Sequence, residues 1–476
     1  MKAYSSLNEI KEDLKKGNVT CVQLTEYYIS NIRKKSHLNA FLEVYEDEAL
    51  QRAREVDAKI KAGKAGKLAG MVIGLKDVLC YKDHKLQASS KILEGFVSQF
   101  NGTAIERLIE EDAIIIGRQS CDEFAMGSSN ENSAFGPVLN DADNTRVPGG
   151  SSGGSAVAVQ ADLCLASLGS DTGGSVRQPA AFCGIVGLKP TYSRISRYGL
   201  IAYSSSFDCI GIITKSVEDA ALLLEVISGP DNNDSTVSQK PVPPYSTQLT
   251  FNKKVKIGYL KDALESDGVS DEIKENTKRA LDVLKQEGHE VKAFEFPLME
   301  YILPTYYILT TAEASSNLSR YDGVRYGHRT KDSSDLESMY KKTRAEGFGK
   351  EVKKRIILGT FVLSASYYDA YYTKAQKVRR LIKEETEKIL SQFDFLVIPT
   401  TPTTAFKIGE NSSDPLAMYL ADVFTVQANL SGIPAISIPN GTDKQGLPIG
   451  LQIMTRAFEE GELLAFSKYL TDKNLN

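Results

Sequence analysis

The stretch from Gly149 to Ser175 reads GGSSGGS AVAVQADLCLASL GSDTGGS, two Gly/Ser loops joined by an apolar segment. A Gly/Ser run taken alone is typical of a flexible linker. Here the run leads directly into Ala156 to Leu168, whose Ala/Val/Leu-rich pattern predicts a buried helix followed by a buried strand. We therefore place both loops within the core of an α/β fold.

The composition of the two loops indicates a catalytic centre. Glycine has no Cβ, so backbone N–H groups can approach a ligand closely, and clustered N–H groups stabilise a developing oxyanion. The serine hydroxyls are candidate nucleophiles. A phosphate-binding loop is the alternative, but the pattern lacks both the lysine that follows the last glycine of a P-loop and the acidic strand end of a dinucleotide site.

The segments on both sides of the loops predict one continuous mixed α/β domain. Residues 6 to 60 have helical spacing, with Thr20 as the expected N-cap of a second helix. The polar, Pro-rich segment Gly229 to Ser246 predicts a surface loop or a boundary between two lobes. The predicted strands are 71–78, 113–117, 210–213, 255–260, 291–296, 395–398, 435–438 and 449–454; the predicted helices are 105–111, 272–287 and one from Ser216, whose Ser-x-x-Asp opening resembles a capping box.

These elements divide the domain into four regions. We expect a helical lead-in at about 1–60, a catalytic core at about 61–230 and a peripheral lobe at about 230–390. C-terminal strands and a helix at about 391–476 should complete the core. The length permits a large core of this kind in one unit.

The composition excludes several classes of protein. With 42% hydrophobic residues, 25% charged residues and a formal net charge of −4, the chain shows no basic footprint for nucleic acid. No apolar run reaches the roughly 18 residues of a membrane span, and the N-terminus lacks a signal-peptide core, so we expect a cytoplasmic protein without a membrane partner. The six cysteines lack CxxC spacing, which predicts buried, reduced thiols.

Histidine is scarce, and this limits the catalytic chemistry. Only His37, His84, His289 and His328 occur, without the spacing of a metal site, so we expect no bound transition metal. A Ser-His-Asp triad would have to recruit one of these four residues. His84 lies in the charged stretch 81–85, which we expect to be exposed to solvent. The catalytic base should therefore be another residue.

Ser175 is the candidate nucleophile, because it closes the DTGGS loop where a strand should turn into a helix. The successive N–H groups of Thr172, Gly173, Gly174 and Ser175 would converge at that turn and form an oxyanion hole. The serine hydroxyl must still lose its proton. Without a histidine, the remaining acceptor is a lysine that burial keeps neutral, since desolvation disfavours the ammonium form.

Lys76 is the candidate base, because it is the one cation in the apolar strand Met71 to Val78. The alternative is a lysine at a strand end that extends its amine to solvent. Ser151, in the first loop, could relay the proton from the nucleophile to Lys76. Ser152 and Ser155 are chemically equal candidates on the sequence alone.

These residues resemble the amidase signature family. The matching segments are Gly149 to Ser155, Gly169 to Ala180 and, upstream, Gly74 to Asp77. The resemblance implies a large mixed β-sheet core covered by helices on both faces. It also implies a Lys-Ser-Ser triad, in which Lys76 is the base, Ser151 is a bridging serine joined to its neighbour by a cis peptide, and Ser175 is the nucleophile that forms the acyl-enzyme. The chain departs from related chains at 72–75 and 209–212, where they often carry proline, and these departures leave the triad in place.

Four further segments resemble one branch of that family, the A subunits of the amidotransferases that act on Asp-tRNA(Asn) and Glu-tRNA(Gln). These segments are Cys121 to Asn140, Glu313 to Gly327, Arg355 to Arg380 and Met418 to Pro439. The resemblance implies a glutaminase that releases ammonia to a partner subunit.

The same resemblance implies a pocket for glutamine, a zwitterion that needs both a cation and an anion. In that pocket Arg355 would bind the α-carboxylate, Asp422 the α-amine, and Tyr306 would line the wall. On the sequence alone, Lys353 to Arg355 is a charge run of the kind that usually faces solvent, whereas Asp422 lies in an otherwise apolar stretch.

The resemblance also implies partners. The chain itself should hold no cofactor, and its sequence contains no P-loop, so a larger B subunit should bind ATP, Mg²⁺ and the charged tRNA, with a small C subunit completing the complex. A stand-alone amidase for small or fatty amides is the alternative within the same fold. A non-catalytic scaffold of an RNA-processing complex is the alternative outside it, and it predicts no dependence on Ser175.

Overall fold

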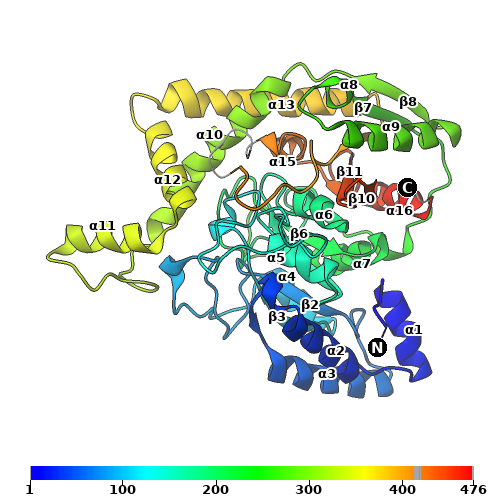
Figure 1. Cartoon of the computed structure of the whole chain (residues 1–476), viewed down its shortest axis with the longest axis horizontal. Coiled ribbons are helices and arrows are strands. Elements are labelled where there is room, and N and C mark those ends of the chain that lie inside the picture. The colour runs from blue at the N-terminus through cyan, green and yellow to red at the C-terminus, as the bar shows by residue number, and fades with distance from the viewer. Residues whose placement is uncertain (1, 412–417, 419, 474–476) are drawn as a thin grey trace.

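The computed structural model describes residues 2–411, 418 and 420–473. Tyr419, part of the segment 418–439 quoted above, lies outside the described residues, as do residues 412–417 and 474–476 of the predicted C-terminal region. Eleven strands form one sheet in the order β1-β3-β2-β4-β6-β5-β10-β11-β9-β7-β8. Figure 1 shows β2 and β3 toward one end of the molecule and β7 and β8 at the other. The strands are β1 Phe41–Val44, β2 Val72–Lys76, β3 Ile114–Gln119, β4 Ala166–Asp171, β5 Val186–Lys189, β6 Cys209–Thr214, β7 Lys256–Leu260, β8 Glu290–Phe294, β9 Phe395–Pro399, β10 Ala435–Thr442 and β11 Pro448–Met454.

The sheet is mixed, and its central strands are fully buried. β2 runs parallel to both β3 and β4, whereas β6 pairs antiparallel with β4 and β5. Every residue of β2, β3, β4 and β6 is buried, as expected for central strands that are covered on both sides. The carboxyl ends of β2 and β4 lie at the same edge of the sheet, because these two strands are parallel neighbours.

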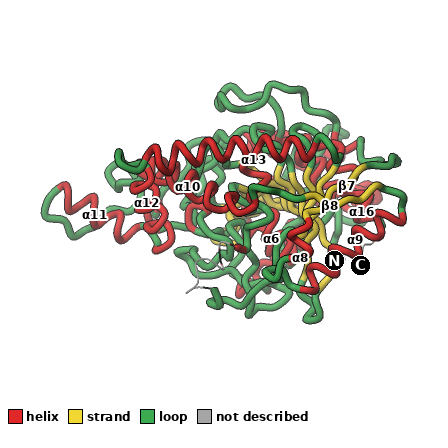
Figure 2. Tube along the Cα trace, turned by 90° about the horizontal axis from the view of Figure 1, so that it is seen from above, coloured by secondary structure: helices red, strands yellow, loops and turns green. Residues whose placement is uncertain are grey.

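Helices pack on the sheet and on one another. Helices α5 and α6 pack together and on the strands near the sheet centre, and α7 packs with α16 and with β5 and β6. The helices are α1 Leu7–Lys16, α2 Cys21–Lys34, α3 Glu46–Lys61, α4 Thr103–Glu110, α5 Gly153–Gln160, α6 Arg177–Cys183, α7 Val217–Ile227, α8 Lys261–Glu265, α9 Asp271–Gln286, α10 Met299–Asn317, α11 Leu336–Gly347, α12 Lys350–Val362, α13 Lys374–Leu390, α15 Val426–Ser431 and α16 Glu460–Asp472. Helix α10 packs against α12 and α13, and α11 projects from one end of the molecule, opposite the fanned strands (Figure 2).

The predicted strands are confirmed, and two features were not predicted. Strand β1 interrupts the helical lead-in and pairs with β3 at the sheet edge. It has only four half-buried residues, too few for a visible alternation. Strands β7 and β8, which lie within the stretch assigned to the peripheral lobe, extend the main sheet beyond β9. The division into four regions stays a prediction.

The predicted helix starts are confirmed in part. Thr20 caps α2 in a complete capping box with Gln23. Ser216 caps α7, but the carboxylate of Asp219 accepts the N–H of Leu7 at 3.0 and 3.1 Å instead of returning to the cap. The second capping box is therefore wrong, because a segment 212 residues away supplies the donor.

Two predictions from composition can be checked against the structure. All six cysteines are free and buried, as expected for reduced thiols in the core. Within the described residues, none of the helices has the length and apolar character needed to cross a bilayer.

Candidate active site

Lys76 ends strand β2 and is completely buried, so the alternative of a lysine reaching solvent is wrong. Its Nζ lies 2.7 Å from the Oγ of Ser151, 2.9 Å from that of Ser152 and 2.9 Å from that of Ser170. Ser151 and Ser152 come from the first Gly/Ser loop, and Ser170 comes from the neighbouring strand β4. The structure therefore gathers three hydroxyls around one amine. Ser170 was missed, although it stands within the GSDTGGS motif itself.

The three hydroxyls differ in what else they bind. The Oγ of Ser152 donates to the carbonyl of Ser170 and accepts from the N–H of the same residue, so Ser152 is held by β4. The hydroxyl of Ser151 bonds to Lys76 and to no other group in the part of the chain that the structure describes. The Oγ of Ser155 has no partner among the described residues and so does not contact Lys76. These contacts favour Ser151 as the relay, a choice the sequence left open. The peptide bond between Gly150 and Ser151 is cis.

Burial lowers the pKa of the Lys76 ammonium to about 8, against the opposing pull of Cys121 and of carboxylates such as Asp122. A neutral amine has two N–H donors and one lone pair. The ammonium form donates to all three hydroxyls, whereas in the neutral form the lone pair can accept from one of them. Because the hydroxyl of Ser152 donates to the carbonyl of Ser170, Ser151 and Ser170 are the remaining donors to the neutral amine. The arrangement can take up a proton from Ser151.

Ser175 stands at the turn between β4 and α6, as predicted, and is 9% exposed. Its carbonyl accepts the N–H of Ser152 at 3.1 Å, which joins the second loop to the first beside Lys76. Below the turn, Asp171 and Arg177 form a fully buried ion pair at 3.0 Å. Burial alone would raise the pKa of Asp171, but Arg177 and the hydrogen bonds around it hold this pKa at about 2. A charged clamp therefore fixes the turn that carries Ser175.

The ion pair of Asp171 and Arg177 also removes one of the expected oxyanion donors. The N–H of Gly174 donates to Asp171 at 2.9 Å and is already occupied. In the described chain, the N–H groups of Thr172, Gly173 and Ser175 have no acceptor. We propose these three as the oxyanion donors, with Gly174 shaping the turn instead. Gly174 has φ +128°, and a Cβ there would lie 2.1 Å from Thr425, so only glycine fits.

The three residues expected to bind glutamine lie together and are buried. A Cβ on Gly173 would lie 2.5 Å from the hydroxyl of Tyr306, which places Tyr306 directly against the proposed oxyanion loop. The charges of Arg355 and Asp422 both act on the pKa of Tyr306, which burial raises. Arg355 is 5% exposed, so its assignment to a solvated charge run is wrong. Burial raises the pKa of Asp422 to about 7, although Ser128 donates to its carboxylate and Arg355 lies nearby.

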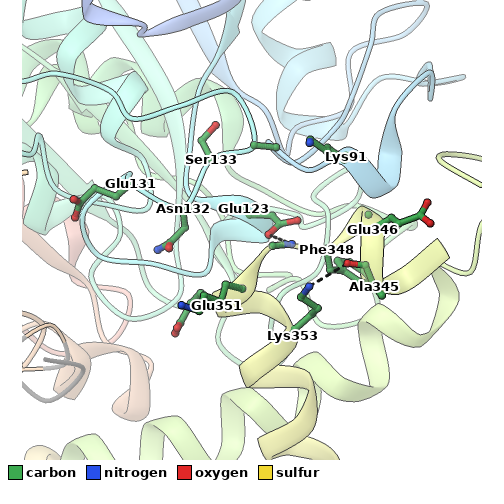
Figure 3. Close-up of a pocket in the computed structure, with 14 residues that line it drawn as sticks. Lys91, Glu123, Glu131, Asn132, Ser133, Ala345, Glu346, Phe348, Glu351 and Lys353 are labelled. Carbon is green, nitrogen blue, oxygen red and sulfur yellow. Dashed lines mark hydrogen bonds between the residues drawn. The ribbon is translucent and has the colours of Figure 1, made fainter. Parts of the chain in front are cut away.

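A cavity of about 480 Å³ lies between the loop 131–134 and the start of α12 (Figure 3). Glu351 lines the cavity and pairs with Arg355 at 2.9 Å, so the cavity lies next to one of the residues expected to bind glutamine. The buried carboxylate of Glu123 accepts the N–H of Gly349 at 2.8 Å and ties the core to the start of α12. The cavity is lined by both lysine and glutamate and therefore has no single charge.

His84 belongs to a different part of the molecule. It is half-buried rather than exposed, since it stacks on Tyr81 with ring centroids 4.0 Å apart and bonds to Glu48 at 2.7 Å. The charged neighbours in the sequence point outward while the ring packs on aromatic side chains. None of the contacts of His84 is to a residue of the serine cluster, which agrees with a base other than histidine.

Comparison with known proteins places this geometry in a family. The chain matches the Amidase family over residues 23–464. It belongs to the amidase family. This amidase is 50% identical over 472 residues to the A subunit of the glutamyl-tRNA(Gln) amidotransferase of Chlorobium phaeobacteroides (strain BS1), with 98% of each chain covered.

Solved structures agree with this assignment. The A subunit of the glutamyl-tRNA(Gln) amidotransferase of Thermotoga maritima is 40% identical to this amidase, with a TM-score of 0.77 over 94% of this chain and 93% of that chain. The peptide amidase of Stenotrophomonas maltophilia is 28% identical, with a TM-score of 0.84 over 99% of this chain and 97% of that chain. The fold predicted from the family resemblance, a large mixed sheet with helices, is thus confirmed.

Proposed function

We propose that this amidase is the glutamine-hydrolysing A subunit of a tRNA-dependent amidotransferase. The observation that carries the proposal is the fully buried Lys76 on the hydroxyl of Ser151, beside the turn that carries Ser175. The full-length likeness to A subunits supports glutamine as the substrate. The alternative, a non-catalytic scaffold, does not explain why a buried amine lies among three serine hydroxyls.

The geometry supports acyl transfer in two steps. The Oγ of Ser175 attacks the carboxamide carbon of glutamine, while its proton passes to Ser151 and the proton of Ser151 passes to Lys76. The N–H groups of Thr172, Gly173 and Ser175 stabilise the tetrahedral oxyanion. The C–N bond then breaks, and Lys76 returns its proton through Ser151 to the departing ammonia. Water hydrolyses the resulting glutamyl ester by the same route and releases glutamate.

The buried charges define the rest of the substrate. Arg355 binds the α-carboxylate, and Asp422 binds the α-ammonium group, which favours the ionised form of a carboxyl whose pKa burial has raised. Tyr306 packs against the oxyanion loop and lines the pocket between Arg355 and Asp422. Both charged groups of glutamine are thereby bound. A simple amide without an α-carboxylate and an α-ammonium group would lack the contacts with Arg355 and Asp422.

Replacing Arg355 by lysine should raise the KM for glutamine by roughly 10²-fold while kcat changes little. The charge is retained, but a compact ammonium cannot hold Tyr203 and Glu351 and also bind a carboxylate with two parallel hydrogen bonds. Steady-state ammonia release measures both constants. Arg380→Lys is the matched control, because Arg380 is an exposed arginine paired with a glutamate four residues away. An unchanged KM in Arg355→Lys would remove this residue from the substrate pocket.

The pH dependence of kcat/KM should have an ascending limb with an apparent pKa near 8, because the base is the neutral amine of Lys76 in the free enzyme. Below pH 8 the amine of Lys76 is mostly protonated and cannot accept a proton, so activity falls; above pH 8 the neutral, active fraction approaches one. Ammonia release at glutamine concentrations well below KM, between pH 6 and 10, gives the profile. A profile that is flat across this range would contradict a lysine base.

We further propose that ATP, Mg²⁺ and the charged tRNA are bound by a larger B subunit, with a small C subunit in the same complex, and that this chain holds no cofactor of its own. Activation of a carboxylate needs ATP, and the sequence of this chain contains no P-loop. The net charge of −4 also disfavours autonomous binding of tRNA. Ammonia made at Ser175 would then pass to the partner.

The purified chain alone, given glutamine, ATP and Glu-tRNA(Gln) or Asp-tRNA(Asn), should form no amidated tRNA. Adding the partner subunits should restore amidation, because the activating chemistry lies on them. Acid gel separation of the tRNA products measures the outcome, and ammonium chloride in place of glutamine serves as a control for the ammonia supply. Amidated tRNA made by the chain alone would refute the proposal that partner subunits carry out the activation of the carboxylate.

A further inference from the structure

The turn Tyr203 to Asp208, which leads into β6, contacts both halves of the proposed site. It is largely buried: Tyr203 is 1% exposed and Asp208 is 3% exposed. The sequence gives no hint of a role for this turn, because its serines and its single carboxylate read as an ordinary loop. Its contacts suggest that the turn sets the relative position of two groups that must act on one substrate molecule.

On one side, the turn holds Arg355. The Nη1 of Arg355 donates to the hydroxyl of Tyr203 at 2.8 Å, and its Nε pairs with Glu351 at 2.9 Å. The guanidinium also lies over the rings of Tyr203 and Tyr307, at 5.7 and 5.5 Å from their centroids. A long, flexible side chain is thereby held in one orientation before substrate arrives, which reduces the entropy lost on binding.

On the other side, the turn holds the oxyanion loop. The hydroxyl of Thr172 donates to Asp208 at 2.8 Å. The same carboxylate accepts the N–H groups of Tyr203 and Ser204 at 3.0 Å, so Asp208 joins the oxyanion loop to the residue that orients Arg355. Burial raises the pKa of Asp208 to about 7 against these bonds. The buried carboxylate of Asp208 therefore accepts hydrogen bonds from two separate segments, the oxyanion loop and the turn itself.

The turn is itself anchored to the helix that carries Tyr306. Glu313 of α10 accepts the hydroxyl of Ser204 and the N–H of Ser206, both at 2.9 Å. Arg379 of α13 donates to the carbonyl of Ser206 at 2.9 Å. These bonds fix the turn to helices α10 and α13.

We propose that Tyr203 and Asp208 are positioning residues, which place the carboxylate-binding Arg355 and the oxyanion loop in one rigid frame. The inference rests on the proposed function, because it assigns Arg355 to the α-carboxylate of glutamine. Tyr203 acts on substrate affinity through Arg355. Asp208 acts on the chemical step through Thr172, whose N–H is one of the proposed oxyanion donors.

The test uses the full-length chain with any subunits that accompany it, and ammonia release from glutamine. Tyr203→Phe should raise KM about tenfold and change kcat less than twofold, because one hydrogen bond to a charged group is lost. Thr172→Val keeps the backbone N–H and removes only the hydroxyl. It should lower kcat about tenfold with little change in KM, and Thr172→Ser should restore kcat. Asp208→Asn should also lower kcat, and adding Thr172→Val to it should lower kcat little further.

Tyr192→Phe is the matched control, because the hydroxyl of Tyr192 donates to Ser205 of the same turn at 2.9 Å without touching Arg355. An equal rise in KM for Tyr192→Phe and Tyr203→Phe would mean that the turn is only structural, and would overturn the inference. So would a loss of kcat in Tyr203→Phe, or an unchanged kcat in Thr172→Val. If the wild-type protein released no ammonia, the proposed function would fail, and this inference with it.

Discussion

Ser175→Ala should abolish glutamine hydrolysis, with a loss in kcat of roughly 10³-fold or more, because the acyl-enzyme cannot form without the hydroxyl. The fold should survive, since the change removes one oxygen from a buried turn that the ion pair of Asp171 and Arg177 holds in place. Ammonia release measures the loss. Mass spectrometry after rapid quenching should find a glutamyl adduct on the wild type and none on the variant.

Ser155→Ala is the matched control for this change. Ser155 lies in the same Gly/Ser run as Ser151, and the sequence alone cannot separate it from the other loop serines. In the structure its hydroxyl is buried without a partner among the described residues and does not touch Lys76. We therefore expect turnover within about twofold of wild type, as for changes that leave an active site intact. A glutamyl adduct on Ser175→Ala would assign the nucleophile to another serine.

Lys76→Met should reduce turnover nearly as strongly as Ser175→Ala, because methionine fills much of the same buried volume but cannot accept a proton. The double variant should be little worse than either single variant, since the two residues act as one unit. The measurement is kcat for all three variants at pH 9, where the wild-type amine is largely neutral.

Lys189→Met controls for the removal of a buried lysine. Lys189 is also fully buried, but its Nζ donates to the carbonyl of Pro190 and not to the serine cluster. This variant should keep its turnover, whatever its thermal stability, and a melting curve for each variant separates the two effects. Full turnover in Lys76→Met, with a normal melting curve, would exclude Lys76 as the base.

The sequence predicted much of the fold for a physical reason. Strands such as β2, β3 and β6 contain short apolar runs, and such runs have few ways to be buried other than in a covered sheet. Strand β1 was missed because four half-buried residues carry no clear period. The place of β7 and β8 in the main sheet was also missed, because strand neighbours far apart in the chain leave no local signal.

Part of the candidate site was likewise predicted from the sequence, and part was not. A lysine in an apolar strand and two Gly/Ser loops were enough to identify Lys76, Ser151 and Ser175 as candidates, with Ser152 and Ser155 still open as relays, and the family resemblance then implied an acyl-enzyme. Local composition determines those features. It does not determine which hydroxyl faces the amine, because that depends on how segments 75 to 94 residues apart meet.

Only the tertiary structure decided the remaining points. It separated Ser151 from Ser152 and Ser155, added Ser170, and showed that Asp171 already occupies the N–H of Gly174. It also buried Arg355, which stands in a charge run, against a tyrosine 152 residues away. Burial of a charged side chain depends on which face of a helix meets the core and on partners brought from distant segments, and neither is encoded in the residues beside it.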